Sequence, residues 1–170
     1  MWLSSTWTTS VAILLVATGA PWRPTSRDDR QKDIPMERTA TCVCGRLRVT
    51  VDGEPARINI CSCKECQRRS GSAFQLGALF DDSQLKAIDG EAKSYARTAD
   101  SGRLIELHFC PTCGVSVYFR AEARPSMIGV HAGCFADPDF PAPNFAVWTE
   151  SKHHWLTLPE VEHSFERQAQ

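Results

Sequence analysis

The 170-residue sequence lacks a surplus of charge of either sign, and it contains neither internal repeats nor low-complexity tracts. Lysine and arginine total 19 against 20 aspartates and glutamates, for a formal net charge of −1. This balance argues against a nucleic-acid binder with a basic stripe and against an acidic tail protein. We therefore expect one globular domain, with or without a tail, and no nucleic-acid partner. Nothing in the sequence predicts an oligomeric state.

The sequence also lacks an apolar run long enough to cross a membrane. Residues 11–20 form a ten-residue apolar stretch, whereas a bilayer needs about 20 residues, so no membrane partner is expected. The length suits a signal-peptide core, but residues 1–10 contain no Lys or Arg. We expect residues 1–35 to be a disordered or mis-started extension, translation to begin at Met36, and the domain to span 36–170 in the cytoplasm. A true signal segment at 11–20 would instead predict export.

From Met36 onward the apolar residues recur with a period of two, which is typical of strands. The clearest stretches are residues 47–51, 74–80, 105–109 and 115–119. Asp-Gly and Ser-Gly dipeptides at 52–53, 89–90 and 101–102 predict turns. Short helices are expected only over Cys63–Arg69, stopped by Gly71, and over Ser83–Ile88. The predicted fold is a small, mostly antiparallel β domain.

Eight cysteines, an even number, stand out against only two tyrosines. A disulfide framework is arithmetically possible, but a chain of this size does not need one for stability. Two cysteines separated by one or two residues in a tight turn present two corners of a zinc tetrahedron. A glycine follows two such turns, at Gly45 and Gly114. The best-matched set for one closed four-thiolate site is Cys42, Cys44, Cys110 and Cys113.

The remaining close-spaced cysteines, Cys61, Cys63 and Cys66, form a group of three. Three thiolates leave one position of a zinc tetrahedron open, which is the arrangement of catalytic rather than structural zinc. One alternative is that Cys134 closes this site, although its apolar, small-residue surroundings favour a buried free thiol. Another is that Cys63 and Cys66 form a redox dithiol, although the βαβ context of that motif is missing.

Three motifs, in this order, resemble those of one family. They are Cys-x-Cys-Gly at 42–45, Cys-x-Cys-x-x-Cys-x-x-x-x-Gly at 61–71 and Phe-Cys-Pro-x-Cys-Gly at 109–114. It is the glutathione-dependent formaldehyde-activating enzyme family, which includes centromere protein V, and the resemblance runs from about Cys42 to Trp155. It implies small β-sheets in the β-tent (Mss4-like) arrangement and two zinc ions per chain. The structural ion is implied on Cys42, Cys44, Cys110 and Cys113, and the catalytic ion on Cys61, Cys63 and Cys66.

The resemblance also implies an activity: condensation of glutathione with formaldehyde to S-(hydroxymethyl)glutathione, a carbon–sulfur lyase reaction in reverse. Glutathione carries two carboxylates, and an arginine can grip a carboxylate with two hydrogen bonds. Lys64, Arg68 and Arg69, within or directly after the trio, are therefore predicted to bind the thiol substrate. His131 has no partner that the sequence identifies, and Trp148 and Trp155 are expected in the core or lining a groove.

A second class of function is also open. Two closed zinc sites could simply stabilise a small β scaffold that docks a protein partner. The distinguishing property is whether the metal of the trio is exchangeable.

Overall fold

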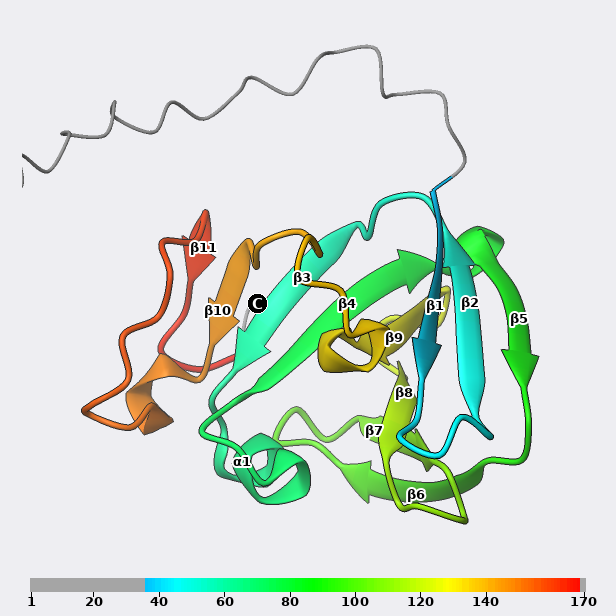
Figure 1. Cartoon of the computed structure of the whole chain (residues 1–170). Coiled ribbons are helices and arrows are strands. Elements are labelled where there is room, and N and C mark those ends of the chain that lie inside the picture. The colour runs from blue at the N-terminus through cyan, green and yellow to red at the C-terminus, as the bar shows by residue number, and fades with distance from the viewer. Residues whose placement is uncertain (1–35, 169–170) are drawn as a thin grey trace, which may run out of the picture. The chain divides into compact units, whose positions relative to one another are not determined.

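The computed structural model describes residues 36–168. The extension expected over 1–35, with its signal-like segment 11–20, lies outside the described residues, as do residues 169 and 170. Within the described part, eleven strands form two sheets and one α-helix is present, which confirms the predicted mostly β fold (Figure 1). No helix of this part has the length and apolar character that a membrane crossing needs.

The smaller sheet has three antiparallel strands in the order β1–β2–β5. The larger has eight, in the order β11–β10–β3–β4–β9–β8–β7–β6. It is antiparallel except at β10, which pairs parallel with both β3 and β11. The strand bounds, in chain order, are β1 Glu37–Thr41, β2 Arg48–Asp52, β3 Arg57–Cys61, β4 Gln75–Asp81, β5 Leu85–Asp89, β6 Lys93–Thr98, β7 Leu104–Phe109, β8 Ser116–Ala121, β9 Met127–His131, β10 Phe145–Val147 and β11 His163–Ser164.

The core lies between the smaller sheet and one face of the larger sheet. Alternation along β2 turns Val49 and Val51 inward, and alternation along β3 does the same for Ile58. They pack in one cluster with Phe80, Val117, Ile128 and Val130 from the neighbouring strands. Each such side chain stabilises the fold by about 1.5–3 kcal/mol through burial. Because strand side chains alternate, Arg57, Asn59 and Cys61 must then share the opposite face of β3.

The helix expected near the trio is present as α1 (Lys64–Ser70), and it ends at Gly71 in the left-handed region with φ of 63°. The helix expected over Ser83–Ile88 is wrong. A 3₁₀ turn, η2 (Asp82–Gln84), is followed there by β5, which pairs with β2. Pairing of Ile88 with Val49 at the edge of the smaller sheet decides the conformation, since tertiary contacts override weak local preference.

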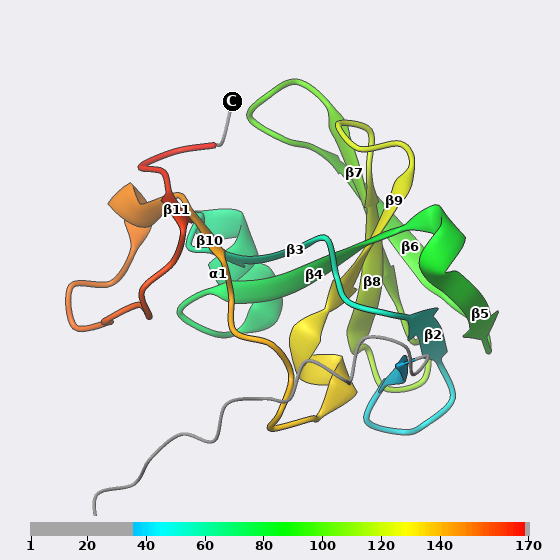
Figure 2. The ribbon, with the colours of Figure 1, turned by 90° about the horizontal axis from the view of Figure 1, so that it is seen from above.

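Of two further 3₁₀ turns, η3 (Ala132–Phe135) precedes the Pro-rich connection into β10, and η4 (Thr149–Ser151) follows β10. Figure 2 shows α1 and β10 at one end of the larger sheet and β2 and β5 at the other. Trp148 lines a cavity next to α1, as expected of a groove residue. Trp155 is 73% exposed and stacks on His153, so its expected place in the core or a groove is wrong.

Candidate metal centres and a cation-lined cavity

Two turns at the end of the smaller sheet and of the β7–β8 pair bring four cysteines together. In the first turn Cys42 N–H donates to the Leu47 carbonyl at 3.0 Å, and in the second Cys110 N–H donates to the Val115 carbonyl at the same distance. The glycine after each cysteine pair has a positive φ, 76° at Gly45 and 74° at Gly114. The sulfur atoms of Cys42, Cys44, Cys110 and Cys113 all lie within 4.8 Å of one another.

The distances within this four-cysteine cluster fit a zinc ion. Sulfur atoms at the corners of a zinc tetrahedron with bonds of ~2.3 Å are about 3.8 Å apart. Here the Cys42–Cys44 and Cys44–Cys110 separations are 3.5 and 3.6 Å. Cys42 and Cys110 are buried at 3% and 0% exposure against the core. The cluster is therefore held by both turns and by the packing beneath them.

Ionisation of the four-cysteine cluster also points to a cation. Burial raises the pKa of Cys42, but the Leu47 N–H and the neighbouring thiols outweigh it and lower the pKa to about 6. The pKa of Cys44, which the Arg46 N–H lowers, is raised overall to about 12 by desolvation and by the other thiols. One sulfur thus ionises at the expense of its neighbour, and a divalent ion would relieve that competition.

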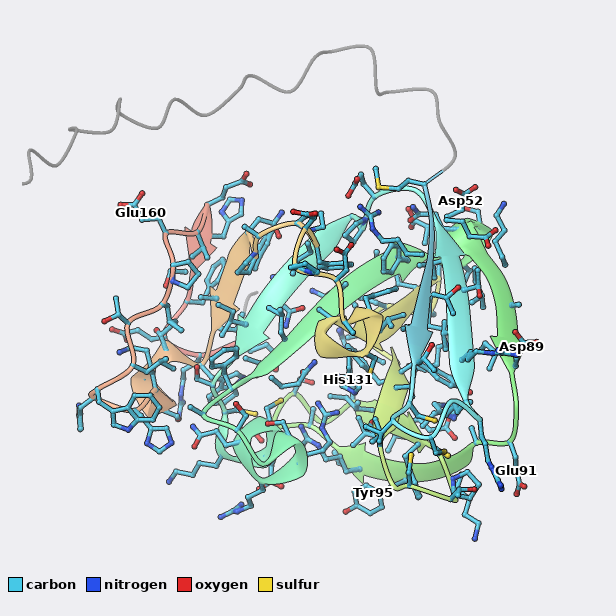
Figure 3. All side chains as sticks on the ribbon, viewed as in Figure 1. Asp52, Asp89, Glu91, Tyr95, His131 and Glu160 are labelled. Atoms are coloured by element: carbon cyan, nitrogen blue, oxygen red, sulfur yellow. The ribbon has the colours of Figure 1, made fainter. Side chains whose placement is uncertain are left out.

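The second cluster forms where β3 ends and α1 begins. Cys61 is the last residue of β3, Cys63 is the N-cap of α1, and Cys66 lies in its first turn. The sulfur of Cys63 accepts a hydrogen bond from the Cys66 N–H at 3.4 Å. The three sulfurs lie within 4.8 Å of one another, with no fourth Cys, His, Asp or Glu of residues 36–168 in the group. In Figure 3 sulfur atoms are drawn beside α1 and, separately, near the turn that joins β1 to β2.

The pKa values of the three thiols in this cluster depend on one another, because the sulfur atoms are hydrogen-bonded together. The pKa of Cys63 is lowered to about 2, because the thiols of Cys61 and Cys66 donate to its sulfur. The pKa of Cys61 is raised by its hydrogen bonds with Cys63 and Cys66. That of Cys66, which the contact with Cys61 lowers, is raised overall by Cys63 and by burial. Three thiolates can coexist here only beside a cation, so the donor set fits zinc with one position left open.

The structure also bears on Cys134, the residue that could have closed the three-cysteine cluster. All eight cysteines are free thiols. Cys134 belongs to neither cluster; its thiol donates to the Ser116 carbonyl at 3.5 Å, and burial raises its pKa to about 11. It therefore does not close the trio and remains a protonated, half-buried thiol.

A polar network from three elements supports the trio from behind. Arg69 of α1 places one guanidinium nitrogen 2.7 Å from His131 Nε2 and the other 3.9 Å from Cys66 Sγ. The side-chain amide of Gln75 lies 2.8 Å from His131 Nδ1 and 3.9 Å from the same sulfur. Gln75 and His131 come from neighbouring strands, β4 and β9. His131, labelled in Figure 3, is only 8% exposed.

Donor and acceptor roles in this network follow from arginine, which can only donate. His131 Nε2 therefore accepts from Arg69, and the ring proton sits on Nδ1. Burial and the adjacent Arg69 charge lower the pKa of His131 to about 3, so the ring is neutral. In the structure Gln75 Nε2 faces Nδ1, and Gln75 Oε1 accepts from the Cys66 thiol. Exchange of the two amide atoms would let the oxygen accept the Nδ1 proton. The Arg69 guanidinium donates to the Cys66 sulfur, as suits a metal-bound thiolate.

A cavity of about 460 Å³ opens in front of the three-cysteine cluster, on the face of the larger sheet that carries Arg57, Asn59 and Cys61. Its floor includes Phe119 of β8, whose ring lies across β9 at Gly129. A Cβ atom at Gly129 would stand 2.1 Å from that ring. Glycine is required there because any side chain would displace the aromatic floor.

The wall of the cavity is strongly basic although the whole chain is nearly neutral. Seven cationic side chains and three carboxylates line it. The three cations predicted from the sequence, Lys64, Arg68 and Arg69, are all among them. Arg68 forms an ion pair with Glu65, while Arg69 belongs to the network behind the sulfurs. A cavity of this volume and charge suits a small anionic molecule.

Sequence reasoning missed His131, Gln75 and Arg57 at this site. His131 and Gln75 are single polar residues whose contacts span 56 positions of the chain, and no local spacing marks them. Arg57 carried a usable signal, because the alternation of Ile58 and Ile60 defines β3. That alternation places Arg57, Asn59 and Cys61 on one face of the strand.

Comparison with known proteins yields one family. A family model described as glutathione-dependent formaldehyde-activating enzyme matches residues 37–151, more than half of the chain and both cysteine clusters. Two curated proteins carry the name "Putative glutathione-dependent formaldehyde-activating enzyme". The one from Fusarium vanettenii is 26% identical over 65% of this chain and 60% of its own length. The one from Penicillium rubens is 25% identical over 65% of this chain and 58% of its own.

The chain thus spans about three-fifths of the length of these curated relatives. A crystal structure of a Rhodobacter sphaeroides protein is also similar, with 24% sequence identity and a TM-score of 0.45. The alignment covers 56% of this chain and 85% of that one.

Proposed function

The chain belongs to the glutathione-dependent formaldehyde-activating enzyme family, and on that premise we propose that it joins glutathione to formaldehyde, giving S-(hydroxymethyl)glutathione. The observation that carries the proposal is the three-cysteine cluster, open on one side, at the wall of a basic cavity. In this proposal Cys61, Cys63 and Cys66 hold a catalytic zinc ion. Cys42, Cys44, Cys110 and Cys113 hold a structural one.

Zinc at the trio would supply one thing: it lowers the pKa of a substrate thiol so that the thiol is present as thiolate at neutral pH. The chain's own residues keep the sulfur donors in place. Arg69 lies 3.9 Å from Cys66 Sγ and offsets the negative charge that three thiolates concentrate there. The N–H of Cys66 does the same for Cys63.

The reaction balances without any redox partner. The substrate sulfur forms a bond to the formaldehyde carbon, the carbonyl electron pair moves to oxygen, and that oxygen takes a proton equivalent to the one the thiol lost. His131 is not the proton donor, because both ring nitrogens are engaged and its lowered pKa keeps the ring neutral. The proton passes through solvent in the open cavity. Lys64, which lines the cavity, attracts a carboxylate of the substrate, while Arg69 adds positive charge from the network behind the sulfurs.

The test is exchange spectroscopy of ¹³C-formaldehyde with glutathione by nuclear magnetic resonance. The zinc-loaded protein is expected to accelerate formation of the adduct above the uncatalysed rate, and Cys63→Ser is expected to remove the acceleration while keeping the fold. Cys134→Ser, outside both clusters, is the matched control and should retain it. Wild-type acceleration in the Cys63→Ser protein would contradict the assignment. Absence of any acceleration by the wild type would favour the scaffold alternative.

A further inference from the structure

The end of the cavity remote from the trio contains two arginines that nothing so far assigns. Arg57 starts β3, four residues before Cys61 on the same strand face, which places the two Cα atoms about 13 Å apart. Arg124, in the β8–β9 connection, lines the same cavity. Within residues 36–168, neither arginine forms an ion pair.

The surroundings of Arg57 leave its charge unbalanced. Its guanidinium stacks on the Phe145 ring, 3.5 Å from the ring centroid. Its Nε is buried and has no hydrogen-bond partner. Burial and the like charge of Arg124 lower its pKa to about 10, so it stays charged at neutral pH. Stacking compensates part of the desolvation, but two neighbouring cations without an anion are an unfavourable arrangement.

Stacking on Phe145 also fixes the direction in which the guanidinium of Arg57 can donate hydrogen bonds. Its plane is set by the ring, so the N–H groups at its edge remain available for an acceptor lying in that plane. A carboxylate matches this fork with two parallel hydrogen bonds. Of the three carboxylates along the cavity wall, Glu65 and Glu150 already pair with Arg68 and Arg167. An incoming carboxylate would therefore find Arg57 and Arg124 free of competition from these two groups.

We infer that Arg57 and Arg124 form a carboxylate subsite that receives one end of an extended thiol substrate whose sulfur lies at the three-cysteine cluster. The inference rests on the proposed function and defines its substrate class: thiols with a carboxylate about a tripeptide's length from the sulfur. An extended tripeptide reaches about 10 Å, and the arginine side chain covers the remaining distance. Free cysteine as a substrate is too short to reach the three-cysteine cluster and the arginine subsite at the same time.

The experiment measures binding of S-methylglutathione to the zinc-loaded full chain by calorimetry. This ligand has no free thiol, so its binding does not depend on thiol chemistry. Arg57→Gln is expected to weaken it about ten-fold or more, since a hydrogen bond to a charged group contributes that much. Arg124→Gln should weaken it by a smaller factor. Arg103→Gln, an exposed arginine outside the cavity, is the matched control and should bind like wild type.

Analogues with one carboxylate converted to the amide identify the group that is bound. For the correct end, amidation weakens wild-type binding but has little further effect in Arg57→Gln, because both changes remove the same contact. Unchanged affinity in a folded Arg57→Gln protein overturns the subsite, as does undetectable binding by the wild type. Arginine-dependent binding without adduct formation would instead refute the proposed reaction and keep the subsite.

Discussion

The two cysteine clusters share one donor chemistry and differ in everything around it. Four sulfurs sit on two matching turns that are held by backbone hydrogen bonds, with Cys42 and Cys110 buried against the core. Three sulfurs sit at a strand-to-helix junction that faces a basic cavity and is backed by Arg69, Gln75 and His131. Under the proposed function, the missing fourth donor and the groups around the trio separate a fold-stabilising site from a reactive one.

The largest expected effect separates the clusters by their contribution to folding. Cys113→Ser should leave the domain unfolded or aggregated, because binding of a structural zinc ion contributes on the order of 10 kcal/mol to folding. Cys63→Ser should keep its circular dichroism spectrum and a cooperative thermal transition. A soluble Cys113→Ser protein with a wild-type transition would remove the distinction.

A second prediction concerns the network behind the trio. His131→Ala should lower the zinc affinity of the three-cysteine cluster about 10–100-fold, the usual effect of losing a partner that orients metal ligands or their supports. The four-cysteine cluster should be unaffected. Competition with a chromophoric chelator measures both affinities. The control is His108→Ala, because His108 stacks on Tyr118 and does not line the cavity in front of the trio. Equal loss in both variants would show that the network plays no part.

The cavity floor gives a third, smaller effect. Gly129→Ala should destabilise the domain by about 1–3 kcal/mol, because the new methyl group overlaps the Phe119 ring. Urea unfolding gives the difference. Gly133→Ala is the matched control, since no atom lies within 4 Å of its added Cβ. If the two variants were equally stable, the Phe119 ring would not be packed tightly against Gly129 of β9.

The smallest effect is a pH dependence of stability that arises from His131, in the network behind the trio. His131 is neutral in the fold, with a pKa of about 3, whereas the unfolded chain takes up a proton below 6.5. Stability should therefore be constant in this respect above pH 6.5 and fall by about 1.4 kcal/mol per unit below it. Denaturant unfolding between pH 7 and 5.5 should show a shallower slope for His131→Asn than for wild type. Identical slopes would contradict the burial of a neutral ring.

Much of this arrangement could be predicted from the sequence because it is local. A Cys-x-Cys or Cys-Pro-x-Cys turn brings its own sulfurs together, and alternation along 47–51 or 115–119 reports which face is buried. The helix expected over Ser83–Ile88 failed because the decisive partner, β2, lies more than thirty residues away. Likewise, the contacts of His131 and Arg57 form only when β10, β3, β4 and β9 lie side by side in the larger sheet. No spacing along the chain encodes that order.

The most direct test of the central claim is the zinc content of the native full chain before and after dialysis against a chelator, measured by native mass spectrometry. The account predicts two ions per chain at the start and one afterwards, with the Cys63→Ser protein holding one throughout. Two ions that both resist the chelator, or that leave together, would contradict the division of labour between the four-cysteine and three-cysteine clusters.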